Sequence, residues 1–564
     1  MFAKAISNND VALVSWRYDD KIKNCLGFAV YRVDANGQET PLPAWVGFQG
    51  GSNTQWQAHT TEEWPVQKYS WRDLTAPRGR QVRYKIVPRI GTPGQLQSDE
   101  DLAQVTAPVT LTPKRGDFQA FFNRGILATQ SLAHALPKSS SGVPNFARLK
   151  DRIDQPGDPL RDRLSAELRT AVLGLFDRAK ADGGEMFAAL YELTDPELEQ
   201  RLLGSNGVHL VLSNTGADDE ENQPARQALH SAGLDITDRF VASNHIGHNK
   251  FVVITNRQGN PAAVWTGSTN WTQTGLCTQS NNGLLIESPS LAGHYMDYWN
   301  RLQTDTTDAS EPKDTQSAEF RQANNRRFSA VADGGDTEIG LWFSPNTEQK
   351  SKPKGADTPS DLDEVFQLIH GAQQAVFFLV FQPGSPSIVE ETAAAEKDNG
   401  GLLVYGAATD PGAVNSFETE LFHRTATKPD KTVVAASAVK DQFAYWQKEL
   451  LKMGPQAHAI IHDKIVVIDP FSEKPTVITG SHNLGFRASF NNDENLLIIR
   501  GNRPLAAAYA THVLDIYQHY RWRATLEEQG DKAFSGLEKN DGWQDKYFKP
   551  TDLSEKEFRF WQSA

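Results

Sequence analysis

One motif occurs twice in this chain of 564 residues, and its repetition constrains the fold more than any other feature. A His-x-Lys triplet stands at 248–250 and again at 462–464, and each copy runs into a short apolar stretch. A Gly-Ser-x-Asn sequence follows each copy, with its glycine 19 or 18 residues after the histidine. Two copies with matched spacing predict an internal duplication at the scale of a whole domain.

The chemistry of the motif follows from strand geometry. Residues separated by one position on a strand point to the same face, so each histidine and lysine would lie side by side. An imidazole beside an ammonium group places a nucleophile or proton donor next to a charge that holds an anion. Two such units that face each other would surround one tetrahedral anion, and a phosphodiester fits this description best.

The repeated motif resembles the signature of the phospholipase D superfamily, His-x-Lys-x4-Asp followed by Gly-Ser-x-Asn. The second copy matches it fully, because Asp469 stands at the last position. The first copy departs from it, because Thr255 stands where the signature has Asp. The resemblance implies two α/β halves that are related by a pseudo-twofold axis and share one cleft.

The same resemblance assigns roles to individual residues. One histidine attacks phosphorus and forms a phosphohistidine, and the other protonates the leaving group and then activates water. We expect His248 to be the nucleophile, with His462 as the alternative. The residues concerned are the catalytic His248, Lys250, His462 and Lys464, the phosphate-binding Asn270, Asn483, Ser268 and Ser481, and the supporting Asp469 and Glu494.

A carboxylate is expected behind one of the two imidazoles. Glu494 lies at the position where relatives place an acid against the histidine, so we expect it to support His462. Aligning 280–284 with 492–496 puts Asn282 at the matching position of the first copy. The two imidazoles would then lie in different electrostatic fields, as unequal roles require.

The periodicity of the chain predicts three regions. Residues 1–112 contain short strands and turn signals and resemble a fibronectin type III or immunoglobulin-like sandwich. Residues 113–320 and 321–564 are expected to form the two phospholipase D-like halves, with helices near 161–181, 290–302, 360–372 and 503–521. The fold class is therefore α/β. The apolar strands favour mostly parallel sheets with helices on both faces.

Composition narrows the function classes. A net charge of −13 argues against broad electrostatic binding to nucleic acid, although a local basic groove is compatible with it. The first ten residues lack the apolar core of a signal peptide, so we expect a cytoplasmic protein or export by another route. We expect no cofactor, because no convincing cluster of metal ligands is present in the sequence. We also expect a monomer.

Three functions remain open at this point. A phospholipase D-type hydrolase would act on phospholipid headgroups at a membrane surface, where Trp271, Phe486 and Phe490 could enter the lipid interface. A nuclease or nucleotide phosphodiesterase of the same superfamily would use the same aromatic residues to stack bases, with Arg487 on a phosphate. A catalytically impaired protein that only binds phosphate, or docks through its N-terminal region, is the third.

Overall fold

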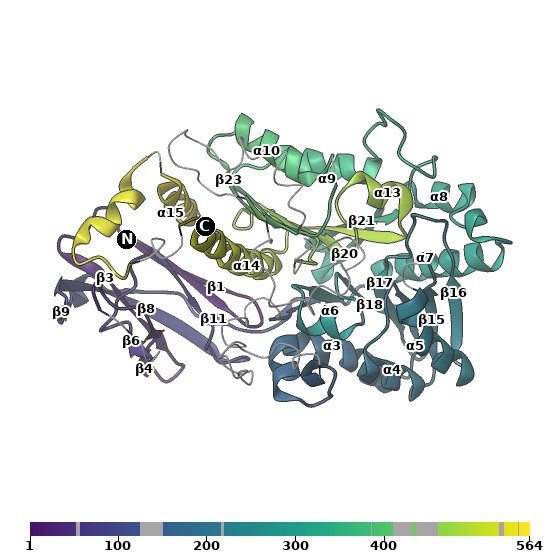
Figure 1. Cartoon of the computed structure of the whole chain (residues 1–564), viewed down its shortest axis with the longest axis horizontal. Coiled ribbons are helices and arrows are strands. Elements are labelled where there is room, and N and C mark those ends of the chain that lie inside the picture. Colours follow the sequence, from purple (N-terminus) through teal and green to yellow (C-terminus); the bar gives the residue numbers. More distant parts are fainter. Residues whose placement is uncertain are drawn as a thin grey trace. The chain divides into compact units, whose positions relative to one another are not determined.

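The computed structural model divides the chain into two compact units (Figure 1). Unit 1 comprises Met1–Pro113, Pro470–Ser472 and Ala507–Ala564, and unit 2 comprises Lys114–Asp469 and Glu473–Ala506. The residues that the structure describes are 1–51, 53, 57–124, 151–215, 219–384, 386–409, 433–435, 461–529, 535–550 and 552–563.

Unit 1 contains two larger antiparallel sheets and a two-stranded antiparallel sheet of β5 and β6. One sheet has the order β1-β2-β7, and the other has the order β10-β8-β3-β4 with β9 and β11 paired to β8. The strands are β1 (Phe2–Ser7), β2 (Ala12–Arg17), β3 (Cys25–Val33), β4 (Glu39–Pro41), β5 (Pro43–Ala44), β6 (His59–Thr60), β7 (Ser70–Asp73), β8 (Gln81–Thr92), β9 (Gln95–Ser98), β10 (Gln104–Val105) and β11 (Val109–Thr110), with the short helix η1 (Glu100–Leu102). Trp16, Phe28 and Tyr84 from both sheets share one buried core. The likeness to fibronectin type III domains stays a prediction.

The C-terminal segment completes unit 1, which differs from the expectation that 321–564 forms one half. Its elements are α14 (Arg503–Gln529), η7 (Asp541–Phe548) and α15 (Leu553–Ser563), and all of α14 beyond Ala506 belongs to unit 1. The physical reason is apolar burial, because Trp543 and Phe558 lie in the same core as Phe28. The Trp543 indole N–H also donates to the Cys25 carbonyl at 2.9 Å.

Unit 2 holds two eight-stranded sheets with the same topology. The first has the order β12-β13-β19-β18-β17-β14-β15-β16. Its elements are β12 (Lys114–Arg115), β13 (Phe118–Phe122), α3 (Pro159–Asp182), β14 (Met186–Leu190), α4 (Pro196–Leu203), β15 (Val208–Ser213), α5 (Asp219–Ser231), β16 (Asp235–Arg239), β17 (Lys250–Thr255), β18 (Pro261–Gly267), α6 (Gln273–Cys277), β19 (Asn282–Ile286) and α7 (Pro289–Thr307).

The second sheet has the order β20-β21-β27-β26-β25-β22-β23-β24. Its half comprises η2 (Pro312–Asp314), α8 (Ala318–Asn324), β20 (Phe328–Ala332), η3 (Asp333–Gly335), β21 (Thr337–Ser344), α9 (Ser360–His370), β22 (Ala375–Val380), α10 (Ile388–Asp398), β23 (Leu403–Ala408), β24 (Val433–Ala435), β25 (Ile465–Ile468), β26 (Thr476–Gly480), α13 (Phe486–Asn491) and β27 (Glu494–Arg500). The duplication predicted from the repeated motif is therefore confirmed at the level of whole sheets.

The expectation of mostly parallel sheets is wrong. Only β14, β15 and β16, and their counterparts β22, β23 and β24, run parallel; the other pairs in each sheet are antiparallel. The reason is connection length. Five residues join β17 to β18, and so short a loop permits only antiparallel pairing, whereas parallel strands need a crossover that usually contains a helix.

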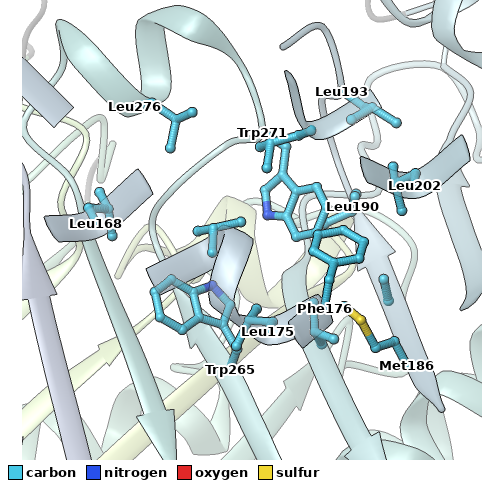
Figure 2. Close-up of a cluster of buried hydrophobic side chains, with 14 of the residues drawn as sticks. Leu168, Leu175, Phe176, Met186, Leu190, Leu193, Leu202, Trp265, Trp271 and Leu276 are labelled. Carbon is cyan, nitrogen blue, oxygen red and sulfur yellow. The ribbon is translucent and has the colours of Figure 1, made fainter. Parts of the chain in front are cut away.

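Helices cover the sheets, as expected for an α/β fold. In the first half, α3–α6 cover the face that carries Val252 and Ile254, and Trp265 and Trp271 fill the centre of that core (Figure 2). Helix α7 covers the opposite face, where Tyr295 packs against Phe251. In the second half, α9 and α10 lie side by side over the sheet (Figure 1). Among the described residues, no helix combines the length and apolarity needed to cross a bilayer.

Candidate active site

Both predicted histidines lie at the junction of the two halves of unit 2. His248 lies two residues before β17, which begins at Lys250, and His462 lies three residues before β25, which begins directly after Lys464. The two imidazole rings are 6.2 Å apart between centroids and meet at 76°. Both side chains are almost completely buried, at 3% exposure. One phosphoryl group placed between the rings would lie within reach of both, since reacting atoms approach to roughly 3–3.5 Å before attack.

The orientation of His248 is set by a carboxylate from the other half. Its Nδ1 lies 2.8 Å from Oε1 of Glu494, the first residue of β27. Glu494 is itself fixed, because Oε1 accepts from the Asn492 amide and Oε2 accepts from the Asn483 backbone N–H. A carboxylate at Nδ1 selects the tautomer with a proton there, which leaves the lone pair of Nε2 for chemistry.

His462 has a neutral partner in the corresponding position. Its Nδ1 lies 2.9 Å from Oδ1 of Asn281, a residue of the first half. The Asn281 amide nitrogen donates to the Gly275 carbonyl, which identifies the oxygen as the atom that faces the ring. His462 therefore also has its proton on Nδ1, but it has an amide rather than a carboxylate behind it.

These contacts correct the expected pairing of Glu494 with His462. Glu494 supports His248, and Asn281 rather than Asn282 is its counterpart. The alignment by sequence was displaced by one residue: Gly267 pairs with Gly283, whereas Gly480 pairs with Leu496. In this register Asn281 is equivalent to Glu494, and Asn282 is equivalent to Asn495. Only the strand pairing reveals this equivalence.

The two lysines occupy equivalent environments. Lys250 Nζ donates to the His248 carbonyl at 2.8 Å, and Lys464 Nζ donates to the His462 carbonyl at 2.6 Å. Each ammonium group also lies over an aromatic ring, 4.8 Å from that of Tyr191 and 5.0 Å from that of Phe381. Both lysines are at most 1% exposed, so their charge is only weakly screened by solvent.

Tyr191 and Phe381 are site residues that the sequence analysis missed. Each follows the strand adjacent to a catalytic strand, β14 or β22, and each meets its histidine edge to face at 4.9 or 5.0 Å. The sequence does contain a signal for them, because each is an aromatic residue directly after an apolar strand at an equivalent place in the two halves. The rings fix the positions of the imidazoles and lysines from one side.

The pKa values of both imidazoles and of Glu494 are lowered, for different reasons in the imidazoles and in the carboxyl group. Burial and Lys250 lower the pKa of His248, against the opposing effect of Glu494, and burial with both lysines lowers that of His462. Burial alone would raise the pKa of Glu494, but the His248 interaction lowers it. At neutral pH the free protein therefore has two neutral imidazoles and an ionised Glu494.

The Gly-Ser-x-Asn segments build the walls of the site. Gly267 and Gly480 have φ of 145° and 133°, and a Cβ there would lie 2.4 and 2.3 Å from a carbonyl oxygen of the neighbouring strand. Ser268 and Ser481 accept from the backbone N–H groups of Asn282 and Asn495, so both hydroxyl groups already anchor the adjacent strand. Their predicted phosphate contact is not needed to explain their burial.

The two predicted phosphate-binding asparagines differ. Asn270 is 1% exposed, and its amide donates to the Glu192 carboxylate at 2.7 Å. Asn483 is partly exposed, and its backbone N–H is the donor to Glu494. The second copy therefore has the more accessible amide. Phosphate binding by both residues remains a prediction.

Asp469 has a structural position that agrees with its expected supporting role. Its carboxylate accepts from the backbone N–H groups of Gln373, Gln374 and Ala375, at the start of β22. In the first copy the Thr255 hydroxyl accepts from the Glu185 N–H just before β14. Threonine thus performs part of the aspartate's task, and the degenerate position leaves the fold intact.

Reciprocal hydrogen bonds join the halves around the catalytic centre. Thr266 donates to the Asn495 side chain at 2.7 Å, and the Asn282 amide donates to Thr479 at 3.0 Å. The pairs are equivalent under the pseudo-twofold relation. Ser280 donates to Asp463 of the second motif at the same junction. These buried hydrogen bonds hold the two halves together beside the histidines.

Two further histidines and three aromatic residues that the sequence analysis considered are buried in structural contacts. His482 lies 3.2 Å from Asp361 in a fully buried pair, and His245 contacts the Gln316 side chain. Trp271 is fully buried, and Phe486 and Phe490 are 5% exposed, so they belong to the cores rather than to a lipid-facing or base-stacking surface. Within the described ranges, no three His, Cys, Asp or Glu residues form a group that could hold a metal ion.

Two imidazoles and two buried ammonium groups lie together on a repeated α/β scaffold, as the resemblance to the phospholipase D signature predicts. The family described as cardiolipin synthase, phospholipase D-like domain, matches residues 183–303 and 365–516, one segment in each half. Both halves of unit 2 therefore belong to the phospholipase D superfamily, whose members include phosphodiesterases.

Several solved structures are similar to parts of this chain. Phosphatidylserine synthase from Haemophilus influenzae is 16% identical in sequence, with a TM-score of 0.41. The matched region covers 63% of this chain and 85% of the synthase chain. Nuc from Salmonella typhimurium is 23% identical over 24% of this chain and 87% of its own, with a TM-score of 0.21. Yeast tyrosyl-DNA phosphodiesterase is 10% identical over 58% and 86%, with a TM-score of 0.30. No curated protein matches the sequence.

Proposed function

We propose that this protein hydrolyses the phosphodiester bond of phospholipids through a phosphohistidine intermediate on His248. The observation that carries the proposal is the arrangement of the imidazoles, which face each other while a residue of the opposite half holds each Nδ1. This arrangement leaves both Nε2 atoms for chemistry. The difference between Glu494 and Asn281 then gives the two rings different roles.

In the first step, the Nε2 lone pair of His248 attacks phosphorus, and the bond from phosphorus to the departing alcohol oxygen breaks. The oxygen takes a proton from Nε2 of His462 as it leaves. Attack makes the His248 ring positive, and the Glu494 carboxylate stabilises that charge. Asn281 could not do so equally well, and this favours His248 as the nucleophile.

In the second step, Nε2 of His462 accepts a proton from water while the water oxygen attacks phosphorus. The P–N bond breaks and its electron pair returns to His248. Lys250 and Lys464 stabilise the negative oxygens in both steps, since buried charges act strongly where water is excluded. The products are an alcohol and a phosphomonoester, which for a phospholipid are the free headgroup and phosphatidic acid.

The first step requires a proton on His462, although burial and the lysines lower its pKa. A bound diester adds negative charge beside both rings, which raises their pKa values. One proton is therefore taken up with the substrate. Attack requires that this proton lie on Nε2 of His462 while His248 stays neutral.

Phospholipid is the preferred substrate class on two grounds. The matched family is described by a lipid-synthesising enzyme, and the net charge of −13 disfavours a nucleic-acid polyanion. The protein should also work without a metal ion, because two lysines supply charge where such enzymes would otherwise use a cation.

A side-by-side assay tests the proposal. Phospholipid vesicles and single-stranded DNA are incubated with the wild-type protein in EDTA, and with His248→Ala as the control. We expect release of headgroup from vesicles, no cleavage of DNA and no activity in the variant. Cleavage of DNA alone would transfer the site to the nuclease class, and activity that requires added Mg²⁺ or Zn²⁺ would refute the metal-independent mechanism.

A further inference from the structure

Unit 2 has a cavity of about 330 Å³. Four segments line it: the loop before His248, the segment that holds Ser351 and Lys352, the loop after β22 and helix α13. Its described lining residues are Asn244, Ser351, Lys352, Pro383, Gly384, Phe486, Arg487 and Asn491. These include two cations and, among the residues that the structure describes, no acid.

The cavity is tied closely to the catalytic residues. Pro383 lies two residues after Phe381, whose ring meets His462, and Phe486 lies three residues after Asn483, whose N–H holds Glu494. The backbone at Gly485, just before helix α13, packs closely against the backbone of Pro383. A Cβ on Gly485 would lie 1.7 Å from the Pro383 carbonyl oxygen. The position of the cavity relative to the centre is therefore fixed by packing.

The two cations converge on this cavity from different elements. Lys352 Nζ lies 4.5 Å above the ring of Phe486, and the Arg487 guanidinium donates to the Asn244 carbonyl at 3.4 Å. Both residues are exposed, and these contacts orient their side chains. A lysine and an arginine on one concave surface match a phosphate or carboxylate group.

We propose that this cavity, the Lys352–Arg487 groove, binds a second anionic group of the substrate while the scissile phosphodiester lies between the histidines. The inference rests on the proposed function and names the substrate class more closely, as a glycerophosphoryl compound with a further phosphate or carboxylate on its headgroup. A nucleotide fits less well. Phe486, the only aromatic residue among the described lining residues, is 5% exposed and covered by Lys352, so it offers no face to a base.

Binding measurements test the groove without turnover. Calorimetry at low salt compares glycerol 3-phosphate with glycerol 1,3-bisphosphate and 3-phosphoglycerate, which have the same three-carbon skeleton and a second phosphate or carboxylate. We expect the wild type to bind the better of these two at least about 10-fold more tightly than the monophosphate, as for charge-assisted contacts, with the preference declining as salt rises.

The double variant Lys352→Gln/Arg487→Gln should lose this preference while keeping the wild-type melting temperature. Lys354→Gln is the matched control, since it removes a charge from the same exposed segment but does not line the groove. It should keep the preference. Equal binding of all three compounds by the wild type, or an unchanged preference in the double variant, would overturn the proposal.

Two further arms separate the possible failures. Thymidine 3′,5′-bisphosphate that binds far more tightly than glycerol 1,3-bisphosphate, with the difference lost in the double variant, would assign the groove to nucleotides and reject the glycerophosphoryl class. Hydrolysis of bis(p-nitrophenyl) phosphate by the wild type tests the proposed function alone. Preferential binding without any hydrolysis would therefore uphold the groove and reject the hydrolase.

Discussion

At the scale of single residues, the difference between Glu494 and Asn281 gives His248 and His462 their proposed roles. Replacing Glu494 by Gln removes the carboxylate that stabilises the positive ring of His248. We expect kcat on bis(p-nitrophenyl) phosphate to fall on the order of 10²-fold or more, because attack limits the rate with so good a leaving group.

The matched variant is Asn281→Asp, which places a carboxylate beside His462 instead. It should change the same rate by less than about 10-fold, since p-nitrophenolate departs without a proton from His462. Steady-state kinetics measure both variants. A larger loss in Asn281→Asp than in Glu494→Gln would show that the roles of the two histidines are reversed.

The lowered pKa values of the imidazoles predict a second residue-scale effect. In the free protein both rings are neutral near pH 7, and a bound dianion raises their pKa, so the complex holds more protons than the free protein. Affinity must then rise as the pH falls, by at most about 10-fold per pH unit for each proton. Sulfate is a suitable probe because it does not titrate in this range.

Calorimetry in two buffers with different ionisation enthalpies gives the number of protons exchanged. We expect net uptake when sulfate binds between about pH 6 and 8, the range around the ordinary histidine pKa. The uptake should decrease in His462→Asn. Sulfate affinity that is independent of pH, or proton release, would contradict the assigned protonation states.

At the scale of elements, the aspartate and threonine of the two motifs should differ in their contribution to stability. Asp469 accepts from three backbone N–H groups and has φ of 47°, which disfavours most non-glycine residues. Asp469→Ala should lower the free energy of unfolding by about 1–3 kcal/mol. Thr255→Val, which removes one accepted bond, should cost about 1 kcal/mol.

Denaturant titration measures both losses, and Asp469→Asn is the control because Asn tolerates positive φ and keeps one acceptor oxygen. Turnover of the folded protein should remain within about twofold, since neither side chain contacts the reacting groups. Loss of activity without loss of stability in Asp469→Ala would place that carboxylate in the chemistry instead.

The repeated motif was sufficient to predict that the two histidines lie together, and their rings are 6.2 Å apart. The catalytic role of the two His-Lys pairs stays a prediction. The motif was not sufficient for the partner of each histidine. That pairing crosses between halves and depends on a shift of one residue in strand register, which leaves no trace in composition or periodicity. The sheets were misjudged for a related reason: a buried apolar strand looks the same whether its neighbours are parallel or antiparallel.

At the scale of the whole molecule, the N-terminal strands do not form a compact unit by themselves. Residues 507–564 belong to the same compact unit, and Trp543 and Phe558 lie in its core. A chain that starts at Lys114 would expose this apolar surface, so we expect it to aggregate, as judged by size-exclusion chromatography.

A point variant gives a milder test of the same packing. Trp543→Ala in the full chain should destabilise unit 1 by about 3–5 kcal/mol, because it opens a cavity and removes the bond to Cys25. Differential scanning calorimetry would show the lowered unfolding temperature of unit 1. A soluble, monomeric chain from Lys114 with full activity would show that the C-terminal segment does not need the N-terminal strands.

The central claim is that His248 carries the phosphoryl group, and trapping the intermediate tests it most directly. In His462→Ala the first step should survive with bis(p-nitrophenyl) phosphate, and the phosphohistidine should accumulate because no base activates water. The reaction is quenched rapidly without acid, and peptide mass spectrometry locates the modification. The account predicts a phosphoryl group on His248 in this variant and none at any residue in His248→Ala. A phosphoryl group on His462 in the wild-type protein would contradict it.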